Sequence, residues 1–271
     1  MAQAYQRFIT TDGLELWDRI DHAQARLTEL ARAVGPQAVV AGSSWTARDL
    51  VGHILTVARR YTERDIRSTD GLGDTVREVD VLNDRELHEL GSLDMTELLA
   101  QLDAQMDKVR GEFPAHEVDL RERFPFHGGT TIDAAGGLSN LVGEFLIHGR
   151  DLARGLGRPW TIDSRDALLI MNGALQVTPG YAEPTATGTL RVLVRTAGAV
   201  DWMLAFAGGR LDSRPATRDE PVDVVLTGPA ETLLLMFYSR IGTVESLRGG
   251  LRVGGPRPWR VARLSKHLQK P

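Results

Sequence analysis

Residues 138–152 read "LSNLVGEFLIHGRDL" and combine the apolar spacing of a buried helix with two ionisable side chains. The leucines and Phe145 recur at steps of three, four and seven, which is the core-facing stripe of an amphipathic helix. Glu144 and His148 are four positions apart, so a helix places them one above the other on that same face. Because an ionised glutamate is costly to bury alone, the stretch predicts a metal ion or an ion pair within a helical core.

The first half of the chain is dominated by helical periodicity. Long amphipathic helices are predicted over residues 14–34, 46–61, 95–113 and 133–156, with a shorter helical piece over 79–90. Thr46 followed by Asp49 forms a capping box, so the second helix should begin directly after Thr46. Before the last of these helices, "FPFHGG" indicates a turn, with His127 expected on its surface. Four long helices joined by loops predict a four-helix bundle.

The second half of the chain predicts a mixed domain. Helices are expected over residues 164–177 and 229–242, a linker over 178–188, and strands at 189–196, 202–208, 222–227 and 251–255. We therefore expect an α+β fold with two domains. The bundle takes residues 1–160, a helix and linker take 161–184, and a small α+β domain takes 185–271.

The composition is that of a globular protein without a nucleic-acid footprint, with a formal net charge of −4 over 271 residues. No apolar run approaches the roughly 18 residues of a membrane span, and the N-terminus lacks the apolar core of a signal peptide. Neither a nucleic-acid nor a membrane partner is expected, and the predicted location is cytoplasmic. The chain has no cysteine, so any thiol chemistry needs a thiol brought by a small molecule.

The predicted second helix carries a further candidate ligand, His53, on its apolar face. His53, Glu144 and His148 together would give three protein ligands, the pattern of catalytic zinc sites that keep a fourth position open. Asp151, three residues after His148, could accept a hydrogen bond from the N–H of an imidazole ligand without itself contacting the metal. Spacing alone leaves other interpretations open: a hydrogen-bonded core histidine, a surface Glu–His pair, and an ion pair between Asp151 and a neighbouring arginine.

Two motifs carry a resemblance to a known family. "WTARDLVGHI" at residues 45–54 and "GEFLIHGRDL" at residues 143–152 resemble the N-terminal domain of mycothiol-dependent maleylpyruvate isomerases and of the wider DinB-like thiol-transferase superfamily. The stretch 222–240, "VDVVLTGPAETLLLMFYSR", resembles the small sterol-carrier-like domain that many of these proteins append. The resemblance implies that His53, Glu144 and His148 bind a divalent metal, usually zinc, and that mycothiol is the thiol cosubstrate.

The resemblance also implies a role for Arg240. Family members often carry Gly-Arg at the end of the C-terminal helix, whereas this chain has Ser239 before Arg240. By resemblance, Arg240 is expected to be a catalytic, substrate-binding residue that holds substrate carboxylates. The alternative is a cation that offsets the dipole at a helix C-terminus.

The expected activity is that of a metal-dependent thiol S-transferase. Coordination to zinc deprotonates a thiol, and the thiolate then attacks an electrophilic small molecule between the two domains, or exchanges into a biosynthetic intermediate. A thiol that adds to a conjugated double bond and leaves again would make the protein a maleylpyruvate-type cis–trans isomerase. Two further alternatives are a metal-binding carrier or regulator of a small ligand, and hydrolysis by metal-bound water.

Overall fold

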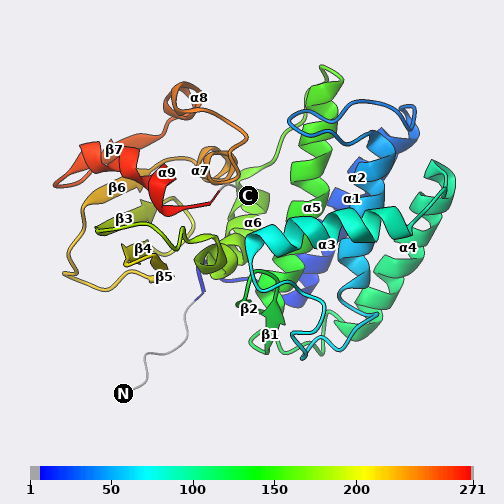
Figure 1. Cartoon of the computed structure of the whole chain (residues 1–271), viewed down its shortest axis with the longest axis horizontal. Helices are drawn as coiled ribbons and strands as arrows, with labels where there is room; N and C mark the ends of the chain where they lie inside the picture. Colours follow the sequence, from blue (N-terminus) through cyan, green and yellow to red (C-terminus); the bar gives the residue numbers. More distant parts are fainter. Residues whose placement is uncertain (1–6, 270–271) are drawn as a thin grey trace. The chain divides into compact units, whose positions relative to one another are not determined.

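The computed structural model describes residues 7–269, which form two units (Figure 1). Residues 11–162 form the helical unit, and residues 7–10 together with 163–269 form the sheet unit. The N-terminal segment joins the sheet unit because Phe8 is fully buried there, with its ring edge-on to Trp202 at 5.8 Å between centroids. The boundaries predicted from the sequence differ: they place residues 7–10 in the bundle, and they treat the helix at 164–177 as a connection between the two domains.

The helical unit contains the predicted long helices. They are α1 (Gly13–Arg32), α2 (Ala47–Arg59), α4 (Met95–Glu112) and α5 (Ala134–Gly155). The predicted short helical piece is α3 (Val76–Glu89), which is about as long as α2. Helix α1 packs on α5 and α4, α2 packs on the same two helices, and α3 lies against α2 (Figure 1). The four long helices thus enclose one apolar core, and the predicted α+β fold class is confirmed.

Side-chain caps fix where the helices of this unit begin. The predicted capping box of Thr46 and Asp49 is present at the start of α2. A second box, formed by Thr75 and Glu78, starts α3 three residues earlier than periodicity alone suggested. Asp133 caps α5 by accepting the N–H of Gly136 at 2.6 Å. This cap fixes the start of α5 directly after strand β2 (Thr130–Asp133).

A β-hairpin precedes α5 where the sequence predicted only a turn. Strands β1 (Arg123–Phe126) and β2 (Thr130–Asp133) pair in antiparallel fashion. The loop between them requires positive φ at Gly128 (71°) and Gly129 (67°), a conformation that glycine adopts without strain. The Gly128 N–H donates to the carbonyl of Gly73, so the hairpin loop is tied to the segment before α3.

The sheet unit has five strands in the order β5-β4-β3-β6-β7. Its elements are α6 (Ser164–Val177), η1 (Thr178–Tyr181), β3 (Thr189–Arg195), β4 (Trp202–Ala207), β5 (Arg210–Pro215), β6 (Val224–Thr227), α7 (Ala230–Phe237), α8 (Thr243–Arg248), β7 (Arg252–Gly254), η2 (Pro258–Arg263) and α9 (Leu264–His267). Strands β3 and β6 are parallel and the other pairs antiparallel. Edge strand β5 was not predicted because its sequence is polar, with Leu211 as its buried residue.

Helix α7 is shorter than the predicted helix over residues 229–242. It ends at Phe237, and Ser239 adopts a left-handed conformation with φ of 56°. The N–H of Arg240 donates to the carbonyl of Leu235 at 2.8 Å, and the N–H of Ser239 donates to the carbonyl of Met236 at 3.0 Å. These bonds satisfy the last carbonyls of the helix and end it. Within residues 7–269, every helix is too short or too polar to cross a bilayer.

Candidate metal centre

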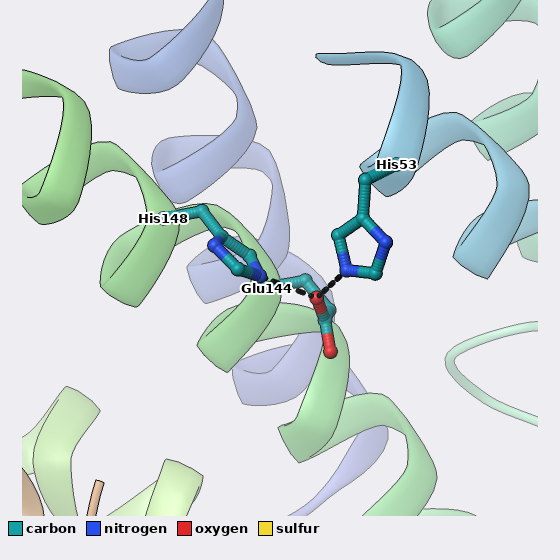
Figure 2. A group of neighbouring side chains, drawn as sticks. All are labelled: His53, Glu144 and His148. Carbon is teal, nitrogen blue, oxygen red and sulfur yellow. Dashed lines mark ion pairs between the residues drawn. The ribbon is translucent and has the colours of Figure 1, made fainter. Parts of the chain in front are cut away.

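Three side chains from two helices of the helical unit point at one another (Figure 2). His53 comes from α2, whereas Glu144 and His148 come from successive turns of α5. The Nε2 atom of His53 lies 3.5 Å from Oε2 of Glu144, and Nε2 of His148 lies 3.2 Å from the same oxygen. The candidate ligand atoms of all three residues lie within 4.8 Å of one another. The structure thus brings together the three residues that the sequence singled out.

The two separations that involve Glu144 fit a tetrahedral divalent ion. Two ligand atoms that each lie about 2.1 Å from such an ion are about 3.4 Å apart, close to both measured separations. The Oε2 atom of Glu144 is also shielded from water and accepts no hydrogen bond from the described residues. A buried carboxylate oxygen that faces two imidazole nitrogens but lacks a donor is an arrangement that a cation would compensate.

The protonation states favour metal binding. Burial lowers the pKa of His53, so its imidazole is neutral near neutral pH. Burial by itself raises the pKa of Glu144, but the imidazoles of His148 and His53 outweigh that effect and hold this pKa well below its usual range. A neutral imidazole and an ionised carboxylate are the forms that bind a metal.

The centre is only partly enclosed. His53 is buried, whereas the side chains of Glu144 and His148 each keep 17% of their surface exposed. The ring of Trp45, just before the N-cap of α2, lies 4.7 Å from that of His53 and 6.0 Å from that of His148, between centroids. The half-buried Trp45 therefore packs beside both imidazoles.

A polar pair behind Glu144 escaped the sequence analysis. Asn140 donates from Nδ2 to the other carboxylate oxygen, Oε1, at 3.3 Å. The Tyr61 hydroxyl hydrogen-bonds with the Asn140 side chain and donates to the carbonyl of Gly137 at 2.8 Å. Burial, and then the charge of Glu144, raise the pKa of Tyr61, so it remains a neutral donor. Asn140 lies four residues before Glu144, a spacing from which it could have been identified.

His127 lies in the hairpin turn, as the sequence indicated, but it is half-buried rather than exposed on the surface. Burial lowers the pKa of His127 to about 4, and the positive charge of Arg60 acts in the same direction, while Glu144 opposes it. The imidazole is therefore neutral at neutral pH and lies within electrostatic range of the centre. Sequence reasoning missed the burial of His127 because the hairpin that carries it was not predicted.

Two predicted residues lie outside the converging set. Asp151 is buried, and its carbonyl accepts the N–H of Ala41 at 3.0 Å, while its role beside an imidazole stays a prediction. Arg240 belongs to the sheet unit, where it is half-buried and donates from Nη1 to the carbonyl of Tyr238 at 2.9 Å. Its role toward a substrate also stays a prediction.

The helical unit belongs to the class of helix bundles that present histidine and carboxylate ligands from facing helices. The family model for the mycothiol maleylpyruvate isomerase N-terminal domain matches residues 17–153, about half of the chain. The chain therefore belongs to this family, as its motifs predicted, and the expectation of an enzyme is confirmed with it.

Solved structures and curated proteins were also compared with the chain. A crystal structure of the mycothiol-dependent maleylpyruvate isomerase aligns with this chain at 13% sequence identity and a TM-score of 0.49. The alignment covers 83% of this chain and 90% of the isomerase chain. A histidine-to-alanine mutant of that isomerase shows the same identity and coverage, with a TM-score of 0.48. No curated protein matches the chain.

Proposed function

We propose that this protein is a metal-dependent thiol S-transferase. It would activate a low-molecular-weight thiol, mycothiol, for attack on an electrophilic small molecule or for exchange into one. The observation that carries this proposal is the convergence of His53, Glu144 and His148 on one point within a chain that has no cysteine. Since the chain offers no thiol, the sulfur must arrive on a cosubstrate, and the family match supports mycothiol in that role.

Each residue of the centre has a distinct task in this proposal. Zinc is the proposed ion, because two imidazoles and one carboxylate leave a position open for a further ligand. When bound, the ion supplies the Lewis acidity that lowers the pKa of the thiol. Asn140 holds the Oε1 atom of Glu144, so that Oε2 is directed at the two imidazoles. Trp45 covers the imidazole rings and keeps water from that side.

The remaining predicted groups enter as part of the same proposal. Asp151 would accept an N–H of an imidazole ligand and so fix its orientation. Arg240 would bind a carboxylate of the electrophilic substrate, a contact that suits a half-buried guanidinium. A cytoplasmic location is proposed because the low-molecular-weight thiol has to be reduced to act.

A second candidate is a thiol-dependent cis–trans isomerase, which the description of the matching family favours. In this reaction the thiolate adds to one carbon of a conjugated double bond, and the electron pair moves onto the conjugated carbonyl. Rotation about the resulting single bond is followed by expulsion of the thiolate. The thiol is then regenerated, whereas the transferase retains it in the product.

The test is a turnover assay with an electrophilic acceptor, run with and without thiol and with and without metal. We expect a rate that requires both, that is lost on chelation and that returns with zinc. His148→Ala should lose bound metal while its helices persist by circular dichroism. A rate independent of thiol would refute both candidates and favour hydrolysis. Recovery of the acceptor with inverted double-bond geometry would select the isomerase.

A further inference from the structure

A polar pocket lies in the helical unit, away from the three converging ligands. It has a volume of about 280 Å³ and is lined by the end of α2, the loop that follows it, and α3. Thr56 in its wall is three residues beyond His53 on α2, and its hydroxyl donates to the carbonyl of His53 at 2.8 Å. We call this the Arg64 pocket, after the residue whose surroundings distinguish it.

Most charges in the pocket wall are already paired. Three arginines face carboxylates of the same wall: Arg60 with Glu86 at 2.6 Å, Arg59 with Glu63 at 3.8 Å, and Arg85 with Glu89 at 3.8 Å. Arg60 also donates to Asn83 at 2.6 Å, so its guanidinium is well satisfied. The paired charges form a neutral wall and leave Arg64 and the exposed Asp70 as the unpaired ones.

Arg64 is the exception in this wall. Its Nη2 atom donates to the carbonyls of Asp65 and Ser68, but Nε and Nη1 are shielded from water and have no acceptor among the described residues. Burial, and then the charge of Arg60, lower the pKa of Arg64, and the nearby carboxylates do not offset them. Shielded guanidinium nitrogens without an acceptor are uncommon, because each unmet donor keeps its full desolvation cost.

We propose that the Arg64 pocket binds the oxyanion of a small molecule, with Arg64 as the principal donor. A carboxylate or phosphate oxygen would accept hydrogen bonds from the vacant Nε and Nη1 donors of Arg64, displacing the weaker influence of the exposed Asp70. The volume suits a small metabolite or one end of a larger one. This site is separate from the metal centre and does not depend on the proposed activity.

The test measures binding of two probes, inorganic phosphate and malonate, to the full-length protein by calorimetry. The measurement is repeated in His148→Ala, so that an anion bound at the metal centre does not contribute. We expect saturable binding in both proteins, weakened about tenfold or more by Arg64→Gln, since the bond lost is a charged one. Arg64→Lys, which keeps the charge but loses the planar donors, should fall between. Arg77→Gln, an exposed arginine of α3 outside the pocket, is the matched control.

Thermal unfolding checks the same site independently of calorimetry. The probe should raise the unfolding temperature of the wild type and of Arg77→Gln, but not that of Arg64→Gln. Tighter binding of phosphate would identify a phosphorylated ligand, and tighter binding of malonate would identify a carboxylate. No saturable binding of either probe, or equal binding by Arg64→Gln and the wild type, would overturn the proposal.

Discussion

Two carboxylates, buried Asp223 in the sheet unit and half-buried Glu144 in the helical unit, differ in the donors that surround them. Asp223 of the sheet unit accepts hydrogen bonds from the backbone N–H of Arg191 at 3.0 Å, from Arg257 at 3.0 Å and from Arg260 at 2.5 Å. The Oε2 atom of Glu144, in the helical unit, faces two imidazoles and accepts no hydrogen bond within residues 7–269. One carboxylate is saturated with donors, and the other has an oxygen left over.

The difference separates a structural acid from a candidate ligand. Burial raises the pKa of each carboxyl, and in each case the partners outweigh burial and lower that pKa, so both are ionised. A low pKa therefore does not distinguish them. The donor count does: Asp223 ties β6 to β3 and η2 with bonds that are already complete, whereas Glu144 can still accept a cation.

The largest expected effect comes from removing the charge of Glu144. Glu144→Gln should weaken metal affinity by more than about a hundredfold, because even residues behind a ligand typically contribute 10–100-fold. Metal content after dialysis, and competition with a chelator, would measure the loss. Glu112→Gln, on the exposed face of α4, is the control and should retain the metal. Unchanged stoichiometry in Glu144→Gln would remove Glu144 from the site.

Asp223→Asn should act on stability and leave metal binding intact. It deprives Arg260 of its carboxylate partner, and that side chain is only 14% exposed. Breaking such a pair costs about 3–5 kcal/mol, measurable as the free energy of unfolding of the sheet unit in urea. Asp212→Asn removes an exposed partner of Arg214 and should change stability by less than about 1 kcal/mol. Loss of metal from Asp223→Asn would contradict the contrast between the two acids.

Asn140→Ala should loosen the metal centre without dismantling it. The variant removes the hydrogen bond to Oε1 of Glu144 and leaves all three candidate ligands in place. Metal affinity should fall about 10–100-fold, measured by the same chelator competition. Asn83→Ala removes an amide that contacts Arg60 instead and should leave the affinity unchanged. Equal affinities for the two variants would show that the Asn140 contact does not position Glu144.

The sequence could predict the local part of this centre. Helical periodicity places Glu144 and His148 on one face because both lie on α5. That His53 meets them depends on which helices pack together; its place on the apolar face of the second helix suggested the meeting, and the family resemblance supported it. The hydrogen bonds of Asp223 were not predicted, because the two arginines that donate to it lie 34 and 37 residues away in the sequence. Distant contacts of this kind leave no periodic pattern in the sequence.

The contrast also extends to pH, because histidines surround Glu144 whereas arginines surround Asp223. The pKa of His127 falls from 6.5 to about 4 on folding. Between these values the unfolded chain binds a proton that the folded chain does not, so stability decreases as pH falls below 6.5. From pH 6.5 to pH 5 this loss amounts to at most about 2 kcal/mol. Arginines stay charged over this range, so Asp223 should add no such dependence.

His127→Gln should therefore reduce the acid sensitivity of the helical unit. The free energy of unfolding, measured at pH 7 and pH 5 on metal-free protein, should differ between the two pH values by up to about 2 kcal/mol less than in the wild type. Removing the metal keeps its release from the ligands out of the measurement, and His53 contributes equally to both proteins. His88→Gln, on the exposed face of α3, should retain the wild-type difference. If His127→Gln also retained it, His127 would be solvated in the folded protein and the acid-sensitive group would have to be His53.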